Sequence, residues 1–339
     1  MRRVLLPHHI ADDAPPAVGA IRDFHGRSMG TSWSVRVVSA EARPDLQDGL
    51  QGQLDAVVAE MSHWEAGSDL GRYNRAPPGS WQQLPPAFFD VLSFALQVAQ
   101  ASGGACDPCA GALVNLWGFG PHGRYGEADF VPPSAQQVSV AMARHGQQRA
   151  AFALDRAGRR AYQPGDLQLD FSAIAKGYGV DRLAYFLKSQ GMRHFLVEVG
   201  GELRGAGVKP DGQPWWVALE QVADAGGINV PDELVLALHG LSVATSGDYR
   251  RYFQHGARRY SHTIDPRSGT PIANDLASVT VLHPHCMAAD AWSTALTVLG
   301  LEAGLALAER LGLAARFVVR GANGFDEQMS SAMKAMLDE

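Results

Sequence analysis

The segment LDFSAIAKGYG, residues 169–179, joins an apolar run to a helical pattern, and the fold prediction starts from it. The run Leu167–Phe171 predicts a strand, and the spacing over Ile174–Ser189 predicts a helix directly after it. Ser172 has a side chain that caps helices, so we expect it at the helix N-terminus. Such a terminus offers free N–H groups to a phosphate, and Lys176 adds a positive charge. The segment lacks the P-loop and Rossmann glycine patterns, so an ordinary capped helix explains it equally well.

The rest of the chain alternates short strands with isolated helices. A strand is predicted over Met29–Val38, and apolar residues at helical spacing predict helices over 46–61 and 86–102. Strand runs broken by isolated helices favour an α+β protein with antiparallel or mixed sheets over a doubly wound parallel sheet. Further strands are expected near residues 150–154, 194–199, 215–219, 234–238, 241–244, 278–283 and 317–319, with helices over 288–299 and 302–311.

Composition limits the class of protein. The chain has 339 residues and a formal net charge of -6, which argues against a nucleic-acid binder held by phosphate contacts. No run of about 18 or more apolar residues is present, so we predict no membrane span and expect the protein in the cytoplasm. Residues 1–24 are expected to form a loosely ordered arm. Residues 25–339 are expected to form one domain, or two intimately joined lobes.

Polar residues gather in the stretch from Val243 to Gly269. A strand leads into a turn, and a predicted hairpin returns to a Ser-His pair and an Asp-Pro turn. His262 and Asp265 there suit a general base and groups that hold metal-bound water. The same residue types are also what ordinary turns use, so the pattern alone leaves both interpretations open.

A carboxylate and a hydroxyl share one face of the predicted helix over residues 288–299. Asp290 and Thr294 lie one turn apart, so both oxygens can reach one hard cation such as magnesium. In the alternative interpretation Asp290 caps the helix and the Thr294 hydroxyl bonds back to the carbonyl of residue 290.

Two further features concern a flat ligand and the thiols. Gly103 and Gly104 permit close backbone approach to a ligand, and Trp64 or Tyr73 can stack on a ring, although aromatic residues at helix ends are usually core. The Cys106–Cys109 pair has the C-x-x-C spacing of redox proteins, but it follows a helix in a loop and does not open one.

Taken in order, these segments resemble one family, the ApbE-type flavin transferases, which are FAD:protein FMN transferases. The resemblance covers about residues 26–300, most of the chain, and nine motifs in register carry it. They are MGTSW, SDLGRYN, SGGACDP, LVNLWGFGP, LDFSAIAKGYGVDRL, FLVEVGGELRGAG, LSVATSGDYRRYF, YSHTIDPRSGTPI and AADAWSTALTVLG.

The resemblance implies an α+β fold related to the T-fold. It also implies a magnesium-dependent reaction that places the FMN part of FAD on a Thr hydroxyl of a partner flavoprotein and releases AMP. The acceptor would be, for instance, a subunit of a membrane redox complex. By motif position the FAD contacts would be Met29, Trp64, Ala105, Cys106, Asp107, Asp170, Lys176 and Ile264, and the magnesium ligands the Ala173 carbonyl, Asp290 and Thr294. Lys176, His262 and Asp265 would be the catalytic groups near the phosphates, with His262 assisting proton removal.

Two departures from the family pattern and three alternatives accompany this hypothesis. Family members commonly carry an export signal with a lipid-anchored cysteine, which this sequence does not show, and Cys106 stands where an apolar residue is usual. The alternatives are an FAD pyrophosphatase that uses water as nucleophile, a non-catalytic FAD-binding protein, and a thiol oxidoreductase built on Cys106 and Cys109.

Overall fold

The computed structural model divides the chain into two compact units, each described separately below. It describes residues 2–7, 19–221, 233–248, 252–256, 258–322 and 324–338. Within these ranges no helix is both long and apolar enough to cross a membrane. Unit 1 comprises Met1–Ala56, Lys176–Gly247 and Asp275–Glu339, and unit 2 comprises Val57–Ala175 and Asp248–Asn274.

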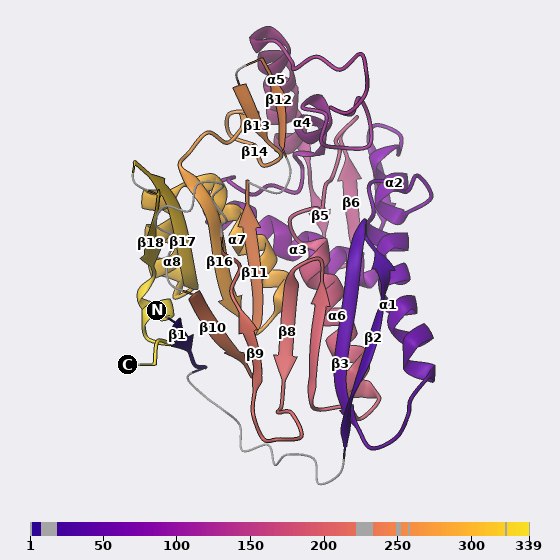
Figure 1. The fold of residues 1–339 in the computed structure, drawn as a ribbon. Coiled ribbons are helices and arrows are strands. Elements are labelled where there is room, and N and C mark those ends of the chain that lie inside the picture. The colour runs from indigo at the N-terminus through magenta and orange to yellow at the C-terminus, as the bar shows by residue number, and fades with distance from the viewer. Residues whose placement is uncertain are drawn as a thin grey trace. The chain divides into compact units, whose positions relative to one another are not determined.

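Unit 1 is built on an antiparallel sheet with the strand order β18-β17-β16-β11-β8-β7-β3-β2 (Figure 1). A smaller sheet, β1-β10-β9, belongs to the same unit, and its pair β1–β10 is parallel. These sheets confirm the predicted α+β class. The strands are β1 Arg2–Leu5, β2 Ala20–Ser28, β3 Thr31–Ser39, β7 Phe195–Val199, β8 Glu202–Ala206, β9 Trp215–Ala218, β10 Glu233–Leu238, β11 Ser242–Gly247, β16 Leu276–His283, β17 Ala314–Gly321 and β18 Gly324–Met329.

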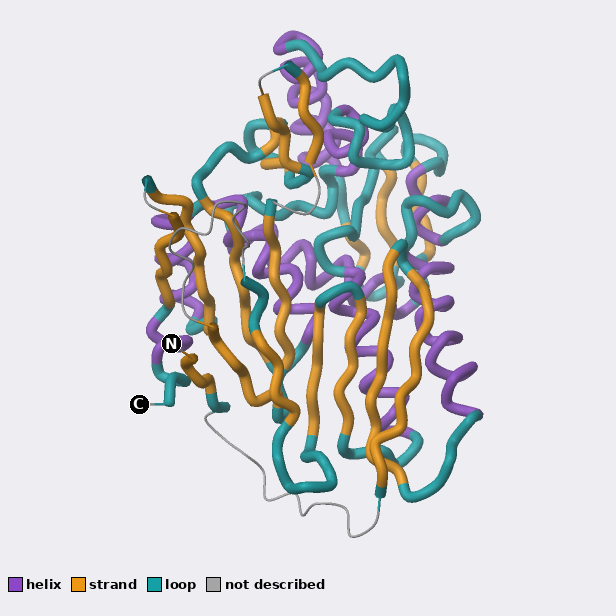
Figure 2. The backbone as a smooth tube through the Cα atoms, in the orientation of Figure 1, coloured by secondary structure: helices purple, strands orange, loops and turns teal. Residues whose placement is uncertain are grey.

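Helices cover one face of the large sheet, where Figures 1 and 2 show α1, α6 and α7 behind the strands. Within unit 1 the first part of the predicted apolar stripe, Leu46, Leu50 and Leu54, is buried there against β3 and β7, because alternate strand residues such as Val35 and Val197 point to that face. The small sheet and the last helix pack in a second apolar cluster with residues such as Val38 and Met333. The helices are α1 Asp45–Met61, α6 Ala175–Ser189, α7 Cys286–Leu299, α8 Leu301–Leu311 and α9 Ser331–Lys334.

The described residues of unit 2 combine helices with three small β-sheets. The helix α5 opens with a capping box between Ser134 and Gln137, and α3 opens with Pro86, the residue type suited to a first helical position. The elements are α2 Asp69–Asn74, α3 Pro86–Ala101, α4 Gly111–Leu116, α5 Ala135–Ala151, the sheet of β4 Ser80–Gln83, β6 Arg160–Gln163 and β5 Leu154–Asp155, and the hairpins β12 Tyr252–His255 with β13 Arg258–Ser261 and β14 Ile264–Asp265 with β15 Thr270–Pro271.

The prediction of a loose arm over residues 1–24 is wrong for the parts of that range that the structure describes. Arg2–Leu5 forms β1 because it pairs in register with Glu233–Leu236 of β10, and Leu5 is fully buried. Residues 20–24 belong to β2, which pairs along its whole length with β3. Residues 1 and 8–18 lie outside the described ranges.

The predicted strand over Leu167–Phe171 does not form, although its backbone groups are paired. The Leu167 N–H donates to the side chain of Gln163, and the Asn74 side chain exchanges hydrogen bonds of 2.8 and 3.0 Å with the backbone of Leu169. Side chains therefore replace a neighbouring strand. The predicted strand over residues 150–154 is also wrong, because α5 continues to Ala151 and only Leu154–Asp155 pairs.

Candidate functional site

In unit 1 the first turn of α6 packs closely against α7. The Gly177 N–H donates to Oδ2 of Asp290 over 2.9 Å. A Cβ atom at residue 177 would lie 2.4 Å from the carbonyl oxygen of Cys286 and 2.7 Å from Cβ of Asp290. Only glycine permits this approach, so the glycine after Lys176 in the sequence has a packing reason.

The start of α7 is held by a buried ion pair. The Asp181 carboxylate on α6 accepts hydrogen bonds of 3.0 Å from the backbone N–H groups of Cys286 and Met287. These N–H groups lie in the first turn of α7, where the helix itself offers them no acceptor. Arg204 on β8 pairs with Asp181, and both side chains are buried. Two elements, α6 and β8, thereby fix the start of α7, and with it the side chains one turn further along.

Asp290 lies in the second turn of α7 and is buried, with 4% of its surface exposed. Burial raises the pKa of its carboxyl group, while Lys176 and the Gly177 N–H oppose this shift. The helix begins at Cys286, so the alternative that Asp290 caps it is wrong.

A group of hydroxyls lies beside Thr294. Ser246 at the end of β11 is 3.0 Å from the Thr294 hydroxyl and 2.8 Å from that of Ser293. It is Ser293 that donates back to the carbonyl of Asp290, so the alternative placing Thr294 in that bond is also wrong. The structure therefore brings a buried carboxylate and three hydroxyls together on β11 and one face of α7.

Glu202 is a residue of this site that the sequence analysis did not identify. It begins β8 directly after Gly200 and Gly201, and its Oε1 accepts a hydrogen bond from Lys176. Its Oε2 is buried and has no hydrogen-bond partner within the described residues. The net pKa of Glu202 is raised to about 7. Burial raises it most, the Lys176 charge lowers it, and the Asp290 charge raises it. The sequence signal for Glu202 was an acidic residue in the motif VGGELRG, at a strand position whose side chain faces the core.

We expect Glu202 to make stability depend on pH. A carboxyl group with a folded-state pKa of about 7 and an unfolded value of 4.5 binds its proton more tightly in the folded protein. Its contribution to stability is complete below the unfolded pKa and is lost as the pH rises toward 7. Across this window the free energy of unfolding should fall by roughly 1–3 kcal/mol more in the wild type than in Glu202→Gln. Urea unfolding at pH 5 and pH 8 measures this, and equal pH dependence in both proteins would contradict it.

Gly177→Ala should destabilise the protein, since the new methyl group overlaps the backbone of α7. We expect a loss of about 2 kcal/mol or more in the free energy of unfolding. Gly52→Ala on α1 is the matched control, because a Cβ atom there meets nothing within 4 Å. That control should leave stability unchanged or raise it by up to about 1 kcal/mol. Equal unfolding midpoints for the two variants would show that the α6–α7 approach is not tight.

In unit 2, Asp170 lies in the extended segment before α6. Its side chain accepts a hydrogen bond of 2.6 Å from the Ser172 N–H and lies 4.0 Å from Nε2 of His63, a neighbour that the sequence analysis did not identify. The helix begins at Ala175, so the prediction that Ser172 caps it is wrong. The Asp170 carboxylate instead forms the turn that precedes the helix.

Of the two aromatic candidates for ring stacking, only Trp64 is exposed. Its side chain is 43% exposed. Tyr73 is buried, and its hydroxyl donates to the carbonyl of Tyr162. Tyr73 is therefore a core residue, and Trp64 remains the predicted stacking surface.

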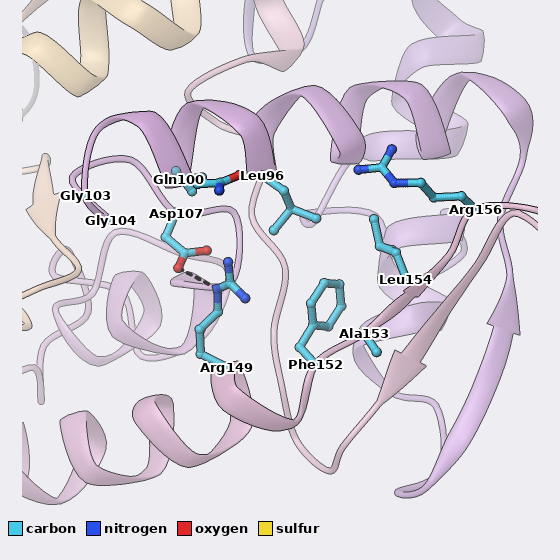
Figure 3. A pocket seen from close by; sticks show the side chains of 11 residues that line it. Leu96, Gln100, Gly103, Gly104, Asp107, Arg149, Phe152, Ala153, Leu154 and Arg156 are labelled. Atoms are coloured by element: carbon cyan, nitrogen blue, oxygen red, sulfur yellow. Dashed lines mark hydrogen bonds and ion pairs between the residues drawn. The ribbon is translucent and has the colours of Figure 1, made fainter. Parts of the chain in front are cut away.

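The loop after α3 is held by its own acidic residue. Gly103 and Gly104 adopt positive φ angles of 62° and 85°. Oδ2 of Asp107 accepts a hydrogen bond of 2.9 Å from Arg149, and Oδ1 accepts one of 2.9 Å from the Cys109 N–H. Figure 3 shows this pair at one end of a cavity of about 530 Å³ between α3 and the end of α5. The Asp107 carboxylate thus stabilises the loop, so a ligand bound at this loop would contact its backbone groups.

Cys109 has the wrong environment for redox chemistry. Cys109 is buried, and burial raises the pKa of its thiol well above the ordinary value, with Asp107 adding to the shift. A thiolate nucleophile requires a lowered pKa and access to solvent. Ala105 and Cys106, the other two predicted contacts in this loop, are buried and half-buried respectively.

The three predicted site residues of the SHTIDP turn in unit 2 have different surroundings. The His262 ring lies 6.4 Å from that of Phe119 in an edge-on arrangement. The Ile264 side chain is buried in an apolar cluster with Trp117, so its contact with a ligand would come from the backbone. Both oxygens of Asp265 accept hydrogen bonds of 2.9 Å from the Arg267 side chain, which makes the pair a brace of the turn. A catalytic role for Asp265 stays a prediction.

Two predicted residues lie in turns. Met29 adopts φ 53° and Gly30 φ 73° in the two-residue loop between β2 and β3, a geometry that strands of this twist favour. Met29 therefore precedes the strand that was predicted to begin with it.

Ala173 belongs to the turn before α6 in unit 2, whereas Asp290 and Thr294 belong to unit 1. The described residues contain no cluster of three or more His, Cys, Asp or Glu side chains suited to a metal, and the assignment of all three ligands stays a prediction.

Comparisons with known proteins agree with these motifs. A sequence profile of the ApbE family matches residues 29–317. The chain is 36% identical to the FAD:protein FMN transferase of Salmonella typhimurium, over 96% of this chain and 93% of that one, and 34% identical to that of Escherichia coli K12, over 93% and 88%. The crystal structure of the Pseudomonas stutzeri flavinyl transferase ApbE, apo form, matches with a TM-score of 0.84 and 40% identity, covering 94% of this chain and 97% of that one. The flavin transferase ApbE of Vibrio cholerae matches with a TM-score of 0.83 and 34% identity over 94% and 99%.

Proposed function

Because the chain belongs to the ApbE family, we propose that it transfers the FMN part of FAD to a hydroxyl group of another protein and releases AMP. The observation in unit 1 that supports this best is the cluster of Lys176, Glu202 and Asp290. A phosphoryl-transfer site requires charge neutralisation and positioning more than a special nucleophile of its own. A lysine beside two buried carboxylates is suited to that task.

Magnesium fits the donors present in unit 1. Asp290 and Thr294 offer a carboxylate and a hydroxyl oxygen from one helix face, which are ligands that magnesium accepts. Two buried carboxylates, one with an oxygen that has no partner, leave local negative charge that a cation would stabilise. Asp290 and Thr294 would hold the ion, together with the Ala173 carbonyl that the family resemblance implies. Bound magnesium would neutralise the charge that develops on a pyrophosphate.

The chain's own residues would position the phosphates and remove a proton. Lys176, in the first turn of α6, would add positive charge at the pyrophosphate. A Thr oxygen of the acceptor would form a bond to the phosphorus on the riboflavin side. The bond from this phosphorus to the bridging oxygen would break, and AMP would leave with the electron pair. His262 is the group that we propose to accept the hydroxyl proton.

The test is one incubation of the protein with FAD, magnesium and a candidate acceptor flavoprotein that carries the target Thr. The acceptor should gain flavin fluorescence that survives denaturing electrophoresis, and AMP should appear in equal amount. Free FMN and AMP without acceptor would instead indicate a pyrophosphatase. Tight FAD binding without turnover would indicate a flavin-binding protein.

A control with Cys106→Ser and Cys109→Ala separates the thiol alternative. We expect this variant to retain the transfer rate, because neither side chain takes part in the proposed reaction. Loss of activity with the fold intact would contradict the proposal and support thiol chemistry.

A further inference from the structure

Residues 122–129 of unit 2 form an exposed stretch that is anchored to the unit at Tyr125 and just beyond its end. The Tyr125 N–H donates to the Gly118 carbonyl over 3.1 Å, and the Tyr125 ring stacks on that of Phe253 at 5.6 Å. At the far end the Phe130 ring meets Phe253 edge-on at 5.3 Å. These contacts fix the backbone that follows Arg124, and the hydrogen bond to Gly118 closes the loop that contains it.

Arg124 lies over the ring of Trp64, the exposed residue predicted to stack on a flat ligand. Its guanidinium carbon is 5.3 Å from the centre of the Trp64 ring, within the range of a cation–π contact. Glu127 and Asp129 are close in sequence, yet no carboxylate among the described residues is within ion-pairing distance of Arg124. In a chain of net charge -6, this arginine thus keeps a positive charge without a matching anion.

We propose that Arg124 is a further FAD-binding residue, which holds the pyrophosphate while the isoalloxazine ring of FAD stacks on Trp64. The inference rests on the proposed function. A ring of FAD that takes the Trp64 face displaces the guanidinium, which is then available to bind an anion. The pyrophosphate is the anionic group of FAD, and a guanidinium binds phosphate oxygens through paired, charge-assisted hydrogen bonds.

The test is equilibrium binding followed by quenching of flavin fluorescence, with FAD and riboflavin as the two probes. Riboflavin has the ring and lacks the phosphates. Arg124→Met should weaken FAD binding about tenfold and leave riboflavin binding unchanged. Trp64→Ala should weaken binding of both probes. Salt should weaken FAD binding to the wild type, and this dependence should be smaller in Arg124→Met.

Two variants serve as controls. Arg124→Lys keeps the charge without the planar fork, so it should fall between the wild type and Arg124→Met. Arg144→Met removes another exposed arginine of unit 2, one that pairs with Asp166, and should leave FAD binding unchanged. Thermal unfolding of each variant confirms that the fold is retained.

The outcomes separate this inference from the proposed function. If Arg124→Met binds FAD within twofold of the wild type, the inference is wrong and the proposed function stands. Equal weakening of FAD and riboflavin would place Arg124 on the ring and would overturn its role at the pyrophosphate. A wild-type protein that binds no FAD would overturn the proposed function and the inference together.

Discussion

Asp290→Ala should lower the rate of flavin transfer at least a hundredfold at saturating magnesium. The variant removes the only carboxylate among the predicted magnesium ligands, and electrostatic stabilisation of this kind is typically worth about 10²–10³ in rate. It also removes the acceptor for the Gly177 N–H, so part of the loss could come from a shift of α6 against α7.

Asp290→Asn separates these two effects, since the amide keeps the shape and a carbonyl oxygen for Gly177. We expect it to retain stability within about 1 kcal/mol and still to lose most of the activity. Thr297→Val, about two turns further along α7, is the control, because the Thr297 hydroxyl donates to the Ser293 carbonyl and is not among the predicted magnesium ligands. The rate is measured as AMP released with acceptor present. Near-normal transfer by Asp290→Asn would show that the metal assignment is wrong.

Lys176→Met should have the second largest effect, because Lys176 acts on two partners. It would supply positive charge to the pyrophosphate, and it forms the ion pair with the buried Glu202. Its loss should lower transfer about a hundredfold and should also destabilise the protein, since an unpaired buried carboxylate is costly.

The double variant Lys176→Met/Glu202→Gln distinguishes the two roles. Without the buried charge, stability should return to within about 1 kcal/mol of the wild type, whereas transfer should stay low. Unfolding by urea and the rate of AMP release give the two readings. Recovery of transfer in the double variant would mean that Lys176 serves only to neutralise Glu202, and the proposed role at the pyrophosphate would fail.

The sequence was sufficient for features that depend on local spacing. The apolar stripe from Leu46 to Met61 predicts α1, and the Ile174–Ser189 pattern predicts α6 to within one residue at its start. Motif order was sufficient for the family, because nine segments in register are specific even where each alone is weak. Local capping rules failed at Ser172, since the Asp170 side chain forms a turn there and delays the helix.

The features that the sequence did not reveal are pairs made by tertiary contact. Lys176 and Glu202, or Asp181 and Arg204, are far apart in sequence, and their types alone do not indicate a shared position in the fold. The segment Leu167–Phe171 has the composition of a strand, but side chains such as Asn74 satisfy its backbone. Trp64 and Tyr73 were equivalent as ring-stacking candidates until burial separated them.

The most direct test of the central claim is intact-protein mass spectrometry of the acceptor after incubation with this protein, FAD and magnesium. We predict that the acceptor gains the mass of one FMN less one water, that the adduct maps to a Thr, and that AMP is released in equal amount. Asp290→Asn and a sample with magnesium chelated should both leave the acceptor unmodified. An unmodified acceptor beside stoichiometric free FMN and AMP in the wild-type sample would contradict the account.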